Sequence, residues 1–260
     1  MVEPYFADEM VTLYLGDMRE VLPALGLVAD AVVADPPYGE TAAAWDRWPD
    51  GWVKALDSAV PASATLWSFG SARMFLDHAV DFVGWRHAQE ALWLKRNGSG
   101  PGSRDRLLKV HEWAYHWYRG RWTDLHHEWN REPAGAAQAM RGGDTVRKAG
   151  RAAAHQRPGR ETVWTDDGTR QPRSVRVVEA PSVRGQKRHQ DEKPVKIVTE
   201  LVRECTPPGG VVLDPFAGSG ATAVAARMSG RRSVLIEADE RYCEAIVNRL
   251  QQDVLPLGTS

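Results

Sequence analysis

The chain has 260 residues, of which 43% are hydrophobic, and its formal net charge is −1. This length and composition suit one large α/β domain with an insertion, and no run of about eighteen apolar residues predicts a membrane span. The N-terminus lacks a basic stretch followed by an apolar one, and the two cysteines form no CxxC pair. We therefore expect a soluble, cytoplasmic protein without a disulfide framework or a zinc site.

The positive charge is concentrated in the middle of the chain. Between Lys95 and Gln190 there are 20 Lys and Arg residues against 10 Asp and Glu, whereas the remainder has 13 against 24. Most of these basic side chains are arginines, which suit phosphates and guanine edges. A charged run is commonly a solvated face, but a basic block in an otherwise acidic protein favours contact with a polyanion.

The apolar pattern predicts strands and helices in alternation. Before residue 120, strands are predicted over 11–15, 31–35, 64–69, 88–95 and 112–118, and helices over 18–25, 45–60 and 70–80. After residue 188, strands are predicted over 211–213 and 233–236, and helices over 195–205, 221–228 and 241–252. This alternation indicates an α/β fold with a doubly wound, mostly parallel sheet of seven strands.

The pattern fails from Gly120 to Arg188. A stretch of that length without periodicity is usually functional or mobile, so we predict an insertion at 120–188, partly flexible, between two halves of one domain at 1–119 and 189–260. Basic residues interleaved with aromatic ones suit nucleic-acid contact, but frequent tryptophans equally suit a small local core. The tryptophans concerned are Trp113, Trp117, Trp122, Trp129 and Trp164.

The first motif that carries chemistry is Asp35-Pro36-Pro37-Tyr38. It follows a buried strand, and ligands of parallel α/β sheets bind at the carboxyl ends of strands. The carboxylate, the free backbone carbonyls and the aromatic face suit a planar group with an exocyclic amine. Alternatively, the prolines only end the strand and Asp35 caps the next helix.

The second motif runs from Asp214 to Gly220 between a predicted strand and a predicted helix. Its glycines allow the backbone to approach a ligand closely, and Glu237 ends the next strand, where an acid can accept from ribose hydroxyls. The glycine spacing differs from the dinucleotide fingerprint. Asp214 ahead of the turn suits an amino or cationic group, and this combination points to S-adenosylmethionine as cofactor.

Together with His189-Gln190-Asp191-Glu192-Lys193-Pro194, these motifs resemble the amino-methylating DNA methyltransferases, which methylate the N6 of adenine or the N4 of cytosine. The order, with the glycine-rich turn after the Asp35 tetrapeptide and a target-recognition region between them, resembles the beta group. The resemblance implies the Rossmann-like fold of S-adenosylmethionine-dependent methyltransferases and double-stranded DNA as partner.

The resemblance also implies roles for individual residues. The catalytic residues are Asp35, Pro36, Pro37 and Tyr38, with Asp35 and the Pro36 carbonyl on the target amine and Tyr38 stacked on the base. The cofactor-binding residues are Asp17, Asp35, Lys193, Pro194, Asp214, Phe216, Ala217, Gly218, Ser219, Gly220, Thr222 and Glu237. The expected DNA-binding residues are Arg121, Arg141, Arg147, Lys148, Arg151 and Arg157, and no metal is expected.

Adenine-N6 is the first choice because the tetrapeptide begins with Asp, whereas cytosine-N4 members more often carry Ser there. The alternatives are a cytosine-N4 enzyme, a catalytically inactive protein that binds DNA and S-adenosylmethionine, and an RNA or protein amine methyltransferase. We expect direct displacement on a base flipped out of the duplex. A homodimer and a cognate restriction nuclease are further candidate partners.

Overall fold

The structure is a computed structural model that describes residues 2–99, 105, 107–129, 131–133, 145–147, 162–164, 169–170, 172–177 and 192–252. The chain forms two compact units. The larger unit combines Met1–Glu128 with Ser174–Ser260, and the smaller unit is Trp129–Arg173.

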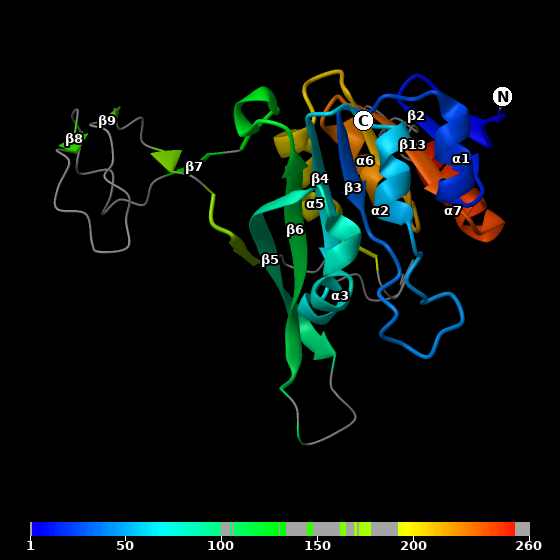
Figure 1. The fold of residues 1–260 in the computed structure, drawn as a ribbon, viewed down its shortest axis with the longest axis horizontal. Helices are drawn as coiled ribbons and strands as arrows, with labels where there is room; N and C mark the ends of the chain where they lie inside the picture. Colours follow the sequence, from blue (N-terminus) through cyan, green and yellow to red (C-terminus); the bar gives the residue numbers. More distant parts are fainter. Residues whose placement is uncertain are drawn as a thin grey trace, which may run out of the picture. The chain divides into compact units, whose positions relative to one another are not determined.

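In the described residues, the larger unit is built on a nine-stranded sheet in the order β1-β2-β13-β12-β3-β4-β6-β5-β11 (Figure 1). The strands from β2 to β4 in this order are parallel, and β6 is antiparallel to β4 and β5. The expected seven-stranded sheet is therefore confirmed, with β1 and β11 added at its edges. The strands are β1 (Phe6–Ala7), β2 (Val11–Leu15), β3 (Ala31–Ala34), β4 (Ala64–Gly70), β5 (Arg86–Ser99), β6 (Lys109–Arg119), β11 (Val175–Val177), β12 (Val211–Asp214) and β13 (Arg232–Glu237).

Helices cover both faces of this sheet. Leu235 and Ile236 are consecutive in β13 but belong to different buried clusters, and successive strand side chains point to opposite faces. One cluster packs α1, α2 and α3 against β3 and β4, and the other packs α6 and α7 against β2. The helices are α1 (Met18–Leu25), α2 (Trp52–Ala55), η1 (Leu56–Ser58), α3 (Ala72–Asp77), η2 (Ala79–Phe82), η3 (Trp122–Asp124), α5 (Val195–Cys205), α6 (Ala221–Met228) and α7 (Glu240–Gln252).

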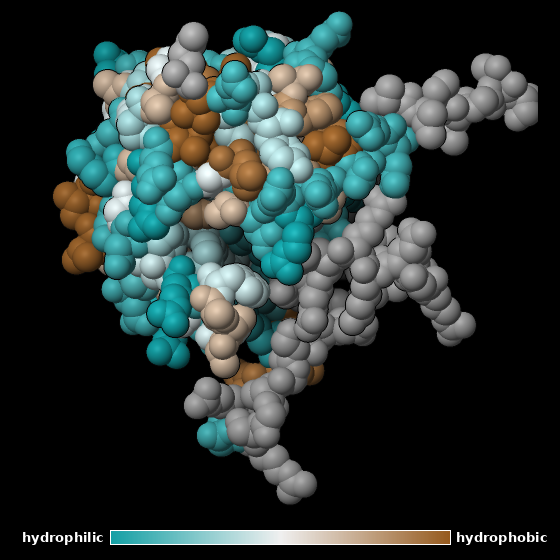
Figure 2. All heavy atoms as spheres, turned by 90° about the vertical axis from the view of Figure 1, so that its right-hand side faces the viewer, coloured by the Kyte–Doolittle hydropathy of each residue, from teal (hydrophilic) through white to brown (hydrophobic). Residues whose placement is uncertain are grey.

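Hydrophilic side chains dominate the face of the molecule in Figure 2, where apolar side chains form separate patches. The large aromatic residues instead fill the interior. Trp52 and Trp67 are completely buried, and Trp117 stacks on Phe82 with ring centroids 4.5 Å apart. Trp117 therefore has a packing role in the larger unit.

The predicted helix over residues 45–60 is wrong for its first half. Residues 45–51 form a loop, and helix begins only at α2 and continues as η1. Pro49 and Gly51 interrupt the segment, and Gly51 has a left-handed backbone (φ 80°) that stops helix from extending toward the N-terminus. The backbone before this loop is bound instead by the side chain of Asp46.

The hairpin formed by β5 and β6 is longer than the sequence predicts. Gly70, the last residue of β4, pairs with Trp113, whereas β6 begins at Lys109 and β5 continues to Ser99. The hairpin therefore extends past the carboxyl end of β4, as Figure 1 shows.

The smaller unit contains two short antiparallel strand pairs. β7 (Glu132–Pro133) pairs with β10 (Thr169–Arg170), and β8 (Thr145–Arg147) pairs with β9 (Thr162–Trp164). Within the unit, Arg170 and Glu132 form an ion pair of 3.2 Å.

Candidate active site

The two sequence motifs lie side by side at one edge of the sheet. β3 and β12 are parallel neighbours, with Val212 opposite Ala31 and Leu213 opposite Val32. Asp35 and Asp214 therefore stand at the carboxyl ends of adjacent strands, where parallel α/β sheets bind ligands. Both carboxylates line one cavity of about 970 Å³.

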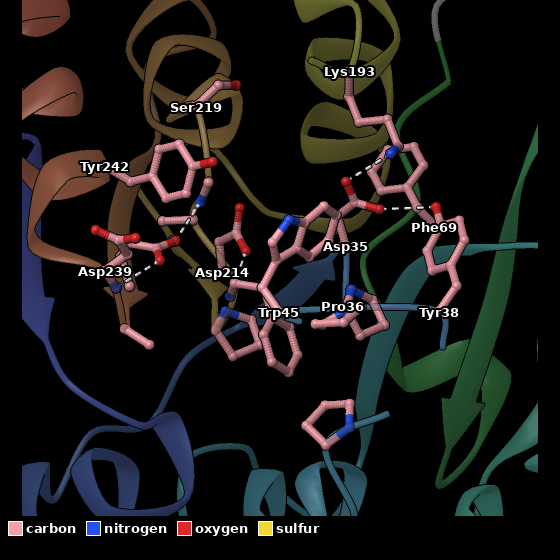
Figure 3. Close-up of a pocket in the computed structure, with 18 of the residues that line it drawn as sticks. Asp35, Pro36, Tyr38, Trp45, Phe69, Lys193, Asp214, Ser219, Asp239 and Tyr242 are labelled. Atoms are coloured by element: carbon pink, nitrogen blue, oxygen red, sulfur yellow. Dashed lines mark hydrogen bonds and ion pairs between the residues drawn. The ribbon is translucent and has the colours of Figure 1, made fainter. Parts of the chain in front are cut away.

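Asp35 is held by two side chains from different parts of the chain. The Tyr38 hydroxyl donates to Asp35 Oδ1 at 2.9 Å, and Lys193 Nζ donates to Oδ2 at 2.6 Å. The same ammonium lies 5.6 Å from the centre of the Tyr38 ring and 5.5 Å from that of Phe69, distances that permit cation–π attraction. Figure 3 shows this group on one side of the cavity. The carboxylate orientation is therefore fixed before a ligand arrives.

Asp46 shapes the loop that follows Tyr38, although no sequence motif marks it. Its Oδ1 accepts the backbone N–H groups of Tyr38 and Gly39, each at 2.8 Å, and its Oδ2 accepts those of Glu40 at 3.1 Å and Thr41 at 2.7 Å. Burial opposes ionisation of Asp46, but the hydrogen bonds from Thr41 and the loop backbone outweigh it and hold its pKa below the usual value. One carboxylate thus fixes the loop next to the Asp35 motif.

Asp214 has a different environment from Asp35. Its side chain accepts from the Phe216 N–H at 3.0 Å and from the Thr222 hydroxyl at 2.5 Å. Burial raises its pKa to about 7, with smaller contributions from the nearby charges of Asp35 and Glu237, against the effect of these hydrogen bonds. A cationic group in the cavity would favour the ionised form.

The glycine-rich turn is held open by its backbone conformation. Gly218 and Gly220 have positive φ values of 49° and 75°, and Gly220 is the N-cap of α6. A Cβ at Gly220 would lie 3.0 Å from Ile246, so a side chain would be strained there and also crowd α7. The turn therefore presents backbone to the cavity.

Glu237 connects this turn to the end of β13. Its Oε2 accepts the Gly218 N–H at 2.8 Å, and its Oε1 accepts the Asp239 N–H at 2.9 Å. Burial raises its pKa against the effect of these bonds. Figure 3 shows Asp239 and Tyr242 on the same side of the cavity as Asp214 and Ser219.

The cavity gathers most of the sequence-predicted site residues. It is lined by Asp17, Asp35, Pro36, Pro37, Tyr38, Lys193, Asp214, Phe216, Ala217, Gly218, Ser219, Thr222 and Glu237. Pro194 is the N-cap of α5, directly after Lys193. Asp17 also caps α1 and pairs with Arg19. Trp45, Asp46, Asp239 and Tyr242 line the cavity as well and were not predicted, because no motif marks them.

Most of the predicted DNA-binding residues lie outside the described residues, namely Arg141, Lys148, Arg151 and Arg157. Arg147 belongs to β8, where its backbone pairs with Thr162. Arg121 is in the larger unit, where its exposed guanidinium is 3.9 Å from Asp124. In the part of the chain that the structure describes, no helix has both the length and the hydropathy needed to cross a membrane.

Comparison with known proteins agrees with this arrangement. The type II methyltransferase M.ScaI of Streptomyces caespitosus is 26% identical over 281 residues, which cover 98% of this chain and 86% of the relative. The crystal structure of M1.HpyAVI in complex with SAM matches with a TM-score of 0.61 and 20% identity, covering 92% of this chain and 100% of the other. The cytosine-N4-specific PvuII DNA methyltransferase also has a TM-score of 0.61, at 15% identity, covering 99% and 91%.

The two structural matches show that the fold is that of the methyltransferases. The model of the N6/N4 DNA methylase family matches residues 29–248, which include both motifs and the segment between them. The resemblance seen in the sequence is therefore confirmed. This chain belongs to the DNA methylase family that methylates exocyclic amines, with S-adenosylmethionine as the methyl donor.

Proposed function

We propose that this chain transfers a methyl group from S-adenosylmethionine to the N6 of an adenine flipped out of double-stranded DNA. The observation that carries the proposal is the single cavity that joins the Asp35 and Asp214 turns. One turn offers an amine acceptor and an aromatic ring, and the other offers a buried acid beside open backbone. A donor and an acceptor bound there would be neighbours.

The residues of the Asp214 turn fit the cofactor. S-adenosylmethionine supplies a methyl group on a positively charged sulfonium and also carries an ammonium group. The buried carboxylate of Asp214, whose pKa is raised to about 7, suits such a cation, and Glu237 lies where ribose hydroxyls could donate. Gly218 lines the cavity and leaves its backbone accessible, whereas Gly220 is buried and does not line the cavity.

The residues of the Asp35 turn fit the target amine. A carboxylate has about four acceptor positions, and the hydrogen bonds from Tyr38 and Lys193 use one on each oxygen. Asp35 can therefore accept an N–H of the target while it stays fixed by both side chains. With the Pro36 carbonyl as second acceptor, the amine nitrogen is oriented toward the cofactor side of the cavity. Most of the rate enhancement then comes from alignment.

Adenine is proposed over cytosine because Asp35 begins the tetrapeptide. The test is to incubate mixed-sequence DNA with methyl-labelled S-adenosylmethionine, digest the product and separate the nucleosides. We expect the label in N6-methyladenine, and sequencing of the modified strands then gives the recognition site. Label in N4-methylcytosine would overturn the choice of base, and the absence of label from DNA would overturn the enzyme assignment.

We propose that the segment containing Arg147, Lys148 and Arg151 contacts the DNA backbone. We expect charge reversal of Arg147, Lys148 and Arg151 to weaken duplex binding and to flatten its dependence on salt, because each lost phosphate contact lowers the slope by about 0.9. Arg73→Glu, at an exposed arginine of α3, is the matched control and should leave the slope unchanged. An unchanged slope in the triple variant would remove this segment from the interface.

We also propose a cellular setting and partners for the enzyme. A cytoplasmic location gives access to the chromosome, and a cognate restriction nuclease, blocked by the methylated product, fits a relative named as a type II methyltransferase. We also propose that the chain forms a homodimer. Light scattering of the purified chain tests it, and a monomer mass at micromolar concentration would contradict it.

A further inference from the structure

The β5–β6 hairpin borders the active-site cavity. Lys109, His111 and Glu112, at the start of β6, line the cavity, and Glu112 lies 4.0 Å from Lys193 Nζ. That ammonium in turn contacts Asp35. The part of the hairpin that extends past β4 therefore begins next to the catalytic carboxylate and leads away from the sheet.

Large apolar side chains are exposed where β6 begins. Leu107 is 94% exposed, Leu108 is 53% exposed and Val110 is 37% exposed. Single exposed leucines are normal on a protein surface, but adjacent ones at the rim of a cavity indicate a binding surface. Lys109 lies between them and adds a positive charge of the kind that contacts phosphate.

The proposed reaction creates a need for such a surface. A base that leaves the duplex costs a few kcal/mol in lost stacking and leaves a gap between its neighbours. Proteins that distort DNA commonly insert apolar side chains between base steps. At about 3.4 Å per residue, Lys109, the first residue of β6, lies about 10 Å along the strand from Glu112, and Leu107 and Leu108 precede it. That length already exceeds the depth of the major groove, about 8.5 Å. Leu107 and Leu108 can therefore reach the base stack while the target base is in the cavity.

We infer that Leu107 and Leu108 form an apolar wedge that enters double-stranded DNA at the step from which the target base is extruded. This inference rests on the proposed function, because it concerns how the target reaches Asp35. Base extrusion is then a role of the larger unit, separate from the phosphate contacts proposed for Arg147, Lys148 and Arg151. The wedge acts on the duplex and not on the methyl transfer itself.

The test compares two oligonucleotide duplexes that contain the recognition site found by sequencing. In the first duplex the target base is paired, and in the second it lies opposite an abasic position, which removes the pairing that extrusion must break. We expect the Leu107→Ala/Leu108→Ala variant to lose at least about tenfold in kcat/KM on the paired duplex, since burying a leucine contributes stabilisation of that order. On the second duplex the loss should be less than twofold.

Met228→Ala is the matched control, because Met228 is an exposed apolar residue at the far end of α6. Leu107→Phe should retain activity on the paired duplex, since it keeps an apolar side chain of sufficient size. Equal losses on both duplexes, or no loss on either, would overturn the wedge. If the unmodified chain transferred no methyl to either duplex, the proposed function itself would fail. Thermal unfolding of each variant shows whether a loss of activity comes from misfolding.

Discussion

Asp35 and Asp214 occupy equivalent places in the fold and have opposite surroundings. Each stands at the carboxyl end of one of two neighbouring parallel strands. Asp35 is partly exposed and is held by the ammonium of Lys193 and the hydroxyl of Tyr38. Asp214 is buried and accepts from two neutral donors, the Phe216 N–H and the Thr222 hydroxyl. The strand end therefore determines the position of each acid, whereas its burial and its hydrogen-bond donors determine which ligand it can bind.

Because of this difference, the two acids suit different ligands in the cavity. An acid with a fixed orientation and spare acceptor positions suits a neutral amine that must be aimed. An acid whose burial raises its pKa to about 7 suits a ligand that brings its own positive charge. Substitutions at the two positions should therefore have separable effects on transfer and on cofactor binding.

The largest effect is expected at Asp35. Asp35→Ala should lower kcat for methyl transfer on the order of 10³-fold, because the amine loses its oriented acceptor. The affinity for S-adenosylmethionine, measured by calorimetry, should change less than about twofold, because Asp35 is assigned to the target amine and Asp214 to the cofactor. Normal turnover in this variant would remove Asp35 from the mechanism.

The next largest effect is expected at Asp46. Asp46→Ala frees four backbone N–H groups and lets the loop after Tyr38 move, and a displacement of about 1 Å at a reacting group can cost about 10²-fold in kcat. Asp46→Asn should recover part of the loss, since its amide oxygen still accepts. Asp50→Ala, at an exposed acid in the same loop, is the control. A change confined to KM would contradict a positioning role.

A smaller effect is expected at Asp214, and it depends on pH. Because the pKa of Asp214 is raised to about 7 without ligand, binding of a cation at lower pH must release a proton. The affinity for S-adenosylmethionine should therefore rise with pH up to about 7 and level off above it. Asp214→Asn should weaken binding about tenfold at pH 8, as expected for a lost charged hydrogen bond, and remove this dependence. If Asp214→Asn kept the same pH dependence of S-adenosylmethionine affinity, the titrating group would not be Asp214.

The smallest effect concerns stability without cofactor. A carboxyl group with a raised pKa favours the folded state most at low pH, and this contribution is lost as pH rises through the folded-state value, here about 7. The melting temperature of Asp214→Asn, relative to the unmodified chain, should therefore increase between pH 4 and pH 8. Ser219→Ala, in the same turn, should show a constant difference. A constant difference in Asp214→Asn would show that its burial does not control stability.

The sequence predicted the sheet and both turns because those features are local. Buried strands read as apolar runs, and paired prolines and glycines mark where they end. Asp46 could not be predicted because four of its hydrogen-bond donors are backbone N–H groups, which leave no trace in residue types. The bond between Lys193 and Asp35 joins residues that are 158 positions apart, so only the folded chain brings them together. The extension of the β5–β6 hairpin past β4 likewise depends on pairing between strands.

The most direct test of the shared cavity uses an analogue in which the N6 of adenine is joined by a short linker to the position of the cofactor's sulfur. Calorimetry would compare its affinity with that of S-adenosylhomocysteine for the unmodified chain and for Asp35→Ala and Asp214→Asn. We expect the analogue to bind more tightly than S-adenosylhomocysteine and to be weakened by both substitutions, whereas S-adenosylhomocysteine is weakened only by Asp214→Asn. If Asp35→Ala left the affinity of the analogue unchanged, the two turns would not serve one reaction.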